Sequence, residues 1–382
     1  MKSKTILIVL LVVVVAVIGI FAAVKRGGGK EEIRIGGNFE LTGNVASFGN
    51  STLKGVQLAL EQANASGELK KKVVLVQVDN KSDVAEAANM ATKLVEQDKV
   101  VALVGPVIST NAISAGKVAQ SLKVPMISPT ATNPVLTEIG EYVFRACFID
   151  DFQGRVMADF AYNQLGSRRA AILFDNGSDY AKGLSKYFKE TFTQLGGTIV
   201  AEEAYLAGDT EFKPQLTKIN AAKADMIYIP GYYQEQGLIA RQARQMGINV
   251  PLTGGDGWDS SELVNIAGAE NLNQIYFTNH YSPDDNSPNV QSFVAAYKEK
   301  YNGEVPDALA ALGYEGGRLL INAINNADPV TPENIQKALS ATKNFPGLGG
   351  EFTFDENRNP IKSAVIIELV NGKQVFKTVV QP

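Results

Sequence analysis

The sequence has very few of the side chains on which most metal sites and nucleophilic active sites depend. Its 382 residues include one cysteine, Cys147, and one histidine, His280. A disulfide framework, a Cys/His zinc cluster and any catalytic Cys/His or Ser/His pair without these two residues are therefore excluded. We expect both residues to be structural, and we predict no catalytic residue and no metal site.

Phosphate-binding motifs and a basic surface are also missing. No GxGxxG follows the first predicted strand, and no GxxxxGK followed by Ser or Thr occurs anywhere. Neither a dinucleotide nor a nucleoside triphosphate is therefore expected, and we predict no cofactor. The formal net charge of −4 offers no basic surface for nucleic acid.

The composition that remains is that of an ordinary globular protein. Hydrophobic residues make up 45% and charged residues 20% of the chain, which argues against fibrous and disordered classes. A chain of 382 residues is too long for one typical domain. The length therefore predicts two or three lobes, each with its own core.

Residues 1–32 differ from the rest. The segment from Thr5 to Val24 is uncharged and strongly apolar, and it follows Lys2 and Lys4. This pattern is typical of an export signal or a membrane-spanning helix. The run is long for a signal peptide and lacks a good small-residue cleavage site, which favours an uncleaved anchor over a cleaved signal. Residues 27–29 are all glycine and form a linker. Because either an export signal or an anchor directs the chain across the membrane, we expect the remainder to be extracytoplasmic.

From Ile33 onward, short apolar runs alternate with segments of helical periodicity, which is typical of parallel βαβ units. The rhythm occurs twice and predicts an α/β protein: two doubly wound parallel-sheet lobes, preceded by the N-terminal hydrophobic helix. The C-terminal part should return to each lobe, so that three chain crossings form a hinge. We expect residues 33–148 and 281–355 in lobe 1, and residues 149–280 and 356–382 in lobe 2.

Hydroxyl and aromatic side chains follow the ends of the predicted strands. In open α/β sheets, ligands bind outside the carboxyl ends of the strands. In lobe 1, Ser109 begins a helix after one strand, and Thr130 and Thr132 follow the next. A helix start with free N–H groups and hydroxyls predicts a small anion site.

The corresponding loops of lobe 2 supply aromatic rings and a carboxylate. Tyr180, Tyr232 and Asp256 follow three of its predicted strands, and Asp256 lies in a turn between glycines. In lobe 1, Phe48 lies on a glycine-flanked loop, where an apolar side chain needs a partner. The two sets together predict a ligand with an anionic and a cationic end.

From residue 33 to the end, the chain resembles the branched-chain amino-acid-binding proteins of ABC importers, with the type I periplasmic-binding fold. Together the matching segments span nearly the whole exported part. They are Leu41-Thr42-Gly43, Phe48-Gly49, Val104-Gly105-Pro106, Ile127 to Pro134, Phe144-Arg145, Asp151 to Gly154, Tyr180 to Gly183, Gly231-Tyr232, Gly247 and Asn265 to Gly268.

The resemblance implies a role for each candidate residue. It implies that Ser109, Thr130 and Thr132 bind the carboxylate and ammonium groups of an amino acid, and that Tyr180, Tyr232 and Asp256 close from the second lobe. Well-known members carry Glu at the position of Asp256 and another aromatic residue at the position of Phe48. The shorter carboxylate still allows an ammonium contact.

The sequence therefore predicts a binding protein and no enzyme. It should capture a small, aliphatic amino acid between two closing lobes, act as a monomer and deliver its ligand to an ABC permease in the membrane. A binding protein or sensor domain for short amides, urea or small carboxylates is the alternative. The identity of the permease and the preferred amino acid stay open.

Overall fold

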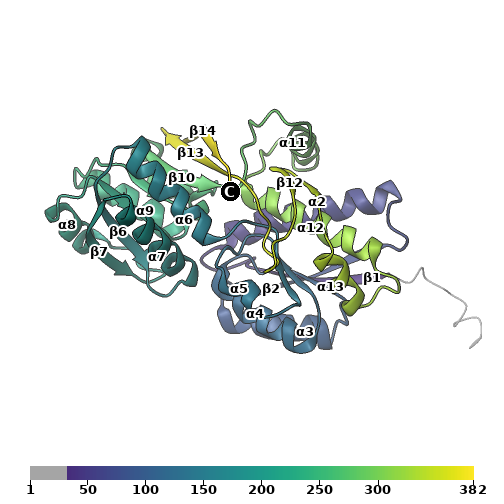
Figure 1. Cartoon of the computed structure of the whole chain (residues 1–382). Coiled ribbons are helices and arrows are strands. Elements are labelled where there is room, and N and C mark those ends of the chain that lie inside the picture. The colour runs from purple at the N-terminus through teal and green to yellow at the C-terminus, as the bar shows by residue number, and fades with distance from the viewer. Residues whose placement is uncertain (1–31) are drawn as a thin grey trace, which may run out of the picture.

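The computed structural model describes residues 32–382, and Figure 1 shows them as two α/β lobes lying side by side. The predicted hydrophobic helix lies outside the described residues. Among residues 32–382, the longest helices are too short or too polar to cross a bilayer. Lobe 1 is defined here by a five-stranded sheet and lobe 2 by a seven-stranded sheet, each with the helices that pack on it.

The sheet of lobe 1 has the strand order β2-β1-β3-β4-β5, and all its strand pairs are parallel. The parallel sheet predicted for this lobe is confirmed, and β5 is an additional strand. The elements are β1 (Ile33–Phe39), α2 (Ala46–Ser66), β2 (Val73–Asp79), α3 (Val84–Glu96), β3 (Leu103–Val104), α4 (Ser109–Leu122), β4 (Met126–Ser128), α5 (Val135–Glu138) and β5 (Val143–Arg145).

The sheet of lobe 2 has the order β14-β13-β10-β9-β8-β6-β7. The elements up to β10 are α6 (Asp150–Asp159), a π-helical turn η1 (Phe160–Gln164), β6 (Arg169–Asp175), α7 (Asp179–Gln194), β7 (Thr198–Tyr205), α8 (Lys213–Ala221), β8 (Met226–Tyr228), α9 (Tyr233–Gln245), β9 (Leu252–Gly254), η2 (Asp256–Trp258), α10 (Leu263–Ala267), η3 (Ala269–Asn271) and β10 (Ile275–Asn279).

The C-terminal part supplies helices to lobe 1 and strands to lobe 2. Strand β13 pairs antiparallel with β10, and β14 pairs antiparallel with β13. The prediction of an entirely parallel second sheet is therefore wrong at this edge, because a hairpin, and no βα crossover, ends the chain. The elements are α11 (Pro288–Lys300), α12 (Ala308–Asn326), α13 (Pro332–Ser340), β11 (Phe345–Gly347), β12 (Gly350–Phe352), β13 (Ala364–Val370) and β14 (Lys373–Val380).

Helix α12 packs against α2 along most of its length. Glycines permit this close approach: a Cβ atom on Gly55 would lie 2.0 Å from the Ala310 carbonyl oxygen, and one on Gly313 would lie 2.1 Å from that of Thr52. Glycine is therefore required where the two backbones meet. This packing matters for the site because α2 carries Phe48 and α12 carries Leu309.

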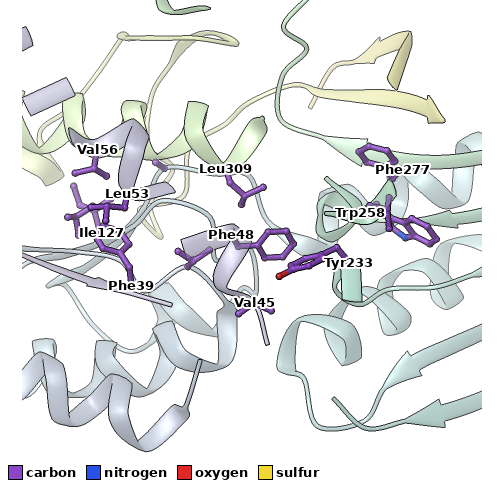
Figure 2. Packing of buried hydrophobic residues seen from close by; sticks show 14 of the residues in the cluster. Phe39, Val45, Phe48, Leu53, Val56, Ile127, Tyr233, Trp258, Phe277 and Leu309 are labelled. Carbon is purple, nitrogen blue, oxygen red and sulfur yellow. The ribbon is translucent and has the colours of Figure 1, made fainter. Parts of the chain in front are cut away.

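The apolar core continues from one lobe toward the other. Figure 2 shows the Phe48 ring pointing toward Tyr233, with Leu53 and Ile127 on the lobe 1 side and Trp258 and Phe277 on the lobe 2 side. Phe48 is buried and lies in the first turn of α2. The sequence predicts Phe48 on a loop. The helix instead starts three residues earlier than expected, and its first turn directs the apolar ring into the core.

Candidate functional site

All seven residues predicted for the ligand site line one narrow cavity between the lobes, with a free volume of about 20 Å³ in this closed form. Six of them are buried and Tyr232 is half-buried. The sequence did not single out Leu309 and Gly257 as lining residues, and it identified Val107 and Ile108 only as parts of a loop. The full lining is Phe48, Val107, Ile108, Ser109, Thr130, Thr132, Tyr180, Tyr232, Asp256, Gly257 and Leu309.

The wall from lobe 1 is built around the start of helix α4. Ser109 is its first residue, and Ile108 at the N-cap position offers no side-chain cap. By contrast, α3 and α7 are capped by Asp83 and Ser178. The first N–H groups of a helix have no intrahelical acceptor. An uncapped start inside a cavity is therefore available to an anion.

Glu40 holds the segment that leads into α4. Its buried carboxylate accepts hydrogen bonds from the N–H groups of Val107 at 3.0 Å and Ile108 at 3.4 Å, and from the Asn111 amide at 3.0 Å. Burial raises the pKa of Glu40 to about 7. The carboxylate lies behind the cavity wall, and its bonds fix the backbone that the wall is made of.

The hydroxyl groups of this wall differ in the hydrogen bonds that they make within the protein. Thr130 Oγ1 donates to the Val107 carbonyl at 2.8 Å, and Ser109 Oγ accepts from the Asn133 N–H at 3.2 Å. Thr132 Oγ1 is buried beside the Asp150 carboxylate, whose pKa it lowers, and it makes no other hydrogen bond among the described residues. Arg145 holds the Thr132 loop by donating to the carbonyls of Ala131 and Asn133.

The wall from lobe 2 is built around the Asp256 carboxylate. Oδ1 accepts from the Tyr180 hydroxyl at 2.8 Å and from Gln153 Nε2 at 3.0 Å, and Oδ2 lies 3.0 Å from His280 Nε2. Burial by itself raises the pKa of Asp256, but these partners, His280 first, outweigh it and hold the pKa below its usual value. The side chain is a buried anion at neutral pH.

A turn aspartate between glycines would ordinarily be exposed, but the Asp256 side chain is buried within a polar network. Gln153 connects it to Asp150 and accepts from Thr278 at 2.7 Å. Burial raises the pKa of Asp150 to about 7. Sequence reasoning quoted Gln153 only as part of a motif and treated His280 as structural. No local sequence pattern connects either residue to Asp256.

Aromatic rings form the remaining side of the cavity. Tyr180 and Tyr232 stack with 5.2 Å between centroids, and Phe48 meets Tyr232 and Tyr233 edge-on at 5.8 and 4.9 Å. With Leu309, these rings give the cavity an apolar region beside the charged group.

The lobes touch each other around the cavity, so this conformation is closed. On one side, Ser47 Oγ lies 3.0 Å from Ser260 Oγ. On the other, the Asp179 N–H donates to Thr110 Oγ1 at 3.1 Å, and the Asn133 amide donates to the Asp179 carbonyl at 2.8 Å. Neither contact uses a residue that lines the cavity.

The predicted structural role of Cys147 agrees with its surroundings. The thiol is buried and donates to the Ala131 carbonyl at 3.3 Å, and burial raises its pKa to about 12. It lies beside the site as a neutral group. Within residues 32–382, no three His, Cys, Asp or Glu side chains are close enough to hold a metal ion.

Comparisons with known proteins agree with this geometry. The family model described as "Periplasmic binding protein" matches residues 32–374. The Leu/Ile/Val-binding protein BraC3 of Rhizobium johnstonii is 34% identical over 85% of this chain and 88% of its own length.

Two solved structures are similar over 92% of this chain. The leucine binding protein LivK of Thermotoga maritima is 39% identical, is covered to 99% and gives a TM-score of 0.88. The branched-chain amino acid transporter substrate binding protein LivJ of Streptococcus pneumoniae, solved with isoleucine, is 41% identical, is covered to 100% and gives a TM-score of 0.87.

Proposed function

This chain belongs to the periplasmic binding protein family, and from that membership and the cavity we propose that it captures a small aliphatic amino acid between its two lobes. The observation that carries the proposal is the pair of opposite walls: an uncapped helix start lined by short hydroxyl side chains faces a buried carboxylate. An α-amino acid has an anion and a cation on one carbon and matches both walls.

The apolar part of the cavity defines the side chain of the ligand. Phe48, Leu309 and Val107 carry no charge that could pair with a basic or acidic side chain. Burial of an aliphatic side chain against them contributes about 1.5 to 3 kcal/mol. The names of the similar leucine- and isoleucine-binding structures support the same ligand class.

A calorimetric screen on residues 33–382 tests this proposal. We expect leucine, isoleucine or valine to bind near 1:1 with an affinity around micromolar, about −8 kcal/mol. Two leucine analogues dissect the walls: 4-methylpentanoate lacks the ammonium group and 3-methylbutylamine lacks the carboxylate. Both should bind far more weakly than leucine. Binding of urea, a short amide or a carboxylic acid in place of every amino acid would contradict the proposal.

The proposed lobes are residues 33–148 with 281–355 and residues 149–280 with 356–382, and they rotate about three crossings. Arg358 and Lys362 donate to the carbonyls of Val143 and Ala146 on the lobe 1 side. These contacts favour a third crossing close to β13, a few residues later than the sequence suggests. Small-angle scattering should give a smaller radius of gyration with saturating leucine than without it. An unchanged radius would contradict the hinge.

The last step of the proposed function is delivery to an ABC permease. In this proposal the protein is a monomer, catalyses no reaction and lies outside the cytoplasm, either anchored through residues 1–32 or released after their cleavage. Deleting the gene should abolish high-affinity uptake of radiolabelled leucine by the cells, and the D256N variant should not restore it. The mass of the mature protein from the membrane fraction distinguishes an anchor from a cleaved signal. Normal uptake in the deletion strain would contradict a role in transport.

A further inference from the structure

His280 lies where the site meets the hinge. It directly follows β10 at the start of the segment that leads back to lobe 1, and its Nε2 lies 3.0 Å from Asp256 Oδ2. Its ring stacks on Phe148, with 3.8 Å between centroids and 25° between planes. Phe148 lies on the segment between β5 and α6, so the stack joins two of the chain crossings.

The Asp256–His280 pair belongs to one lobe. One glycine separates Asp256 from the end of the neighbouring strand β9. Strands β9 and β10 pair in parallel within the sheet of lobe 2. We therefore expect the pair to persist when the lobes open, so that Asp256 keeps these partners before a ligand arrives.

The hydrogen bonds of His280 allow both a neutral and a cationic ring, at different costs. The Nε2–H bond to Asp256 is available to either form. Nδ1 is buried without a partner among residues 32–382, so a cationic ring leaves one N–H group unsatisfied. In the free protein, the neighbouring carboxylate offsets that cost, because an opposite charge at hydrogen-bond distance favours the cation.

We propose that His280 positions Asp256 and that its proton and the ammonium group of the ligand are alternative counterions of this one carboxylate. This inference rests on the proposed function, because it requires a ligand with an ammonium group. Binding then displaces the proton of His280 to solvent, and a proton on His280 weakens binding by the same factor.

Apart from Tyr180, the other titratable groups near His280 do not contact the Asp256 carboxylate directly. From the third crossing, Lys362 forms a buried ion pair with Glu315 at 2.7 Å. From the first crossing, Cys147 carries a neutral thiol and Arg145 donates to three carbonyls. From α6, Asp150 reaches Asp256 only through Gln153. Of the three side chains that contact the Asp256 carboxylate, His280 is the one that can carry a positive charge.

The sequence makes the experiment direct, because His280 is its only histidine. In an untagged protein, one imidazole resonance reports its protonation by NMR without assignment. We expect saturating leucine to lower the titration midpoint of that resonance by about one pH unit or more, since a second cation at the carboxylate disfavours the first. A midpoint that leucine leaves unchanged, or a ring that keeps one charge state from about pH 5 to 8 in both forms, overturns the proposal.

Binding measurements with variants provide the second readout. H280Q keeps an N–H donor but cannot take up a proton. Whatever its affinity for leucine at about pH 8, H280Q should lose less than about threefold between about pH 8 and 5, while the parent should lose about tenfold over the same range. E299Q is the control, because Glu299 is exposed on α11 away from the cavity, and it should keep the parent's pH dependence of binding.

The two hypotheses fail differently. If no amino acid binds the parent at any pH, the proposed function is wrong. If leucine binds but H280Q has the same pH profile as the parent, the proposed function survives and the role of His280 is wrong.

Discussion

The two walls of the cavity are built on different principles. The lobe 1 wall consists of backbone N–H groups and short hydroxyls at a helix start, and Glu40 and Arg145 hold it from behind. The lobe 2 wall consists of long side chains, in which Tyr180, Gln153 and His280 all hold one carboxylate. A backbone site survives the loss of a hydroxyl, whereas a side-chain site depends on each member. Single substitutions should therefore affect lobe 2 more strongly than lobe 1.

The largest effect on binding is expected for D256N, which removes the charge but keeps the size of the side chain. Loss of one partner of a buried charge pair costs about 2 to 5 kcal/mol, so affinity for leucine should fall about 30-fold to several thousand-fold. Isothermal titration calorimetry with leucine measures this loss of affinity. The exposed charge variant E299Q on α11 is the control and should bind as the parent does. Parent-like binding by D256N would show that no ammonium group meets this carboxylate.

The lobe 1 wall is tested through Glu40 and pH. The pKa of Glu40 is about 7 in the folded protein against 4.5 as its ordinary value. Its folded form therefore binds the proton more tightly, and the stability it contributes is fully present below about pH 4.5 and is lost as pH rises through about 7. The free energy of unfolding of E40Q relative to that of the parent should rise by about 3 kcal/mol from about pH 5 to 8, on top of a constant loss from the hydrogen bonds that the amide cannot accept.

Denaturant unfolding of E40Q and the parent across this pH range measures the difference. Asp150 titrates in the same direction, so the comparison between the two proteins is needed to isolate Glu40. A difference that does not change with pH would show that Glu40 is ionised throughout.

A smaller loss is expected for Y180F. The substitution keeps the stacked ring but removes the hydroxyl that donates to Asp256 and accepts from the Gly257 N–H at 3.0 Å. A hydrogen bond to a charged group contributes about 1.5 to 3 kcal/mol, which predicts about a tenfold or greater loss of leucine affinity. Y187F, a surface tyrosine of the same helix, is the matched control. An unchanged affinity would show that Gln153 and His280 suffice to orient Asp256.

The smallest effect separates two neighbouring hydroxyls of lobe 1. T132A removes a hydroxyl whose protein neighbour is the Asp150 carboxylate, while T130A removes one bonded to the Val107 carbonyl. We expect T132A to lose about 1 kcal/mol of binding free energy, about fivefold, and T130A to lose less. Thermal unfolding should show the reverse order, because Thr130 supports the loop. Equal effects of both on binding would contradict a specific role for the Thr132 hydroxyl.

Much of this architecture follows from local pattern. The alternation of apolar runs and helical segments from Ile33 to β9 predicts the parallel units, since burial on both faces leaves near-continuous apolar strands. Strand β14 was missed because a strand joined to its neighbour by a hairpin has no βα rhythm. Strand β10 was missed although it pairs parallel with β9 after a short helix. Ser109, Thr130, Thr132, Tyr180, Tyr232 and Asp256 could be chosen because parallel strands end at one edge of a sheet.

The sequence by itself determined the two-lobe α/β fold, the family and the side chains at the strand ends, because helical and strand periodicity and strand-end position are local properties. Only the tertiary structure decided which distant groups meet there. Leu309 enters the cavity because α12 packs on α2 through Gly55 and Gly313, and His280 reaches Asp256 because β10 lies beside β9. Long-range packing brings these residues together from distant parts of the chain. The partners that orient the buried carboxylate therefore cannot be identified from their spacing in the sequence.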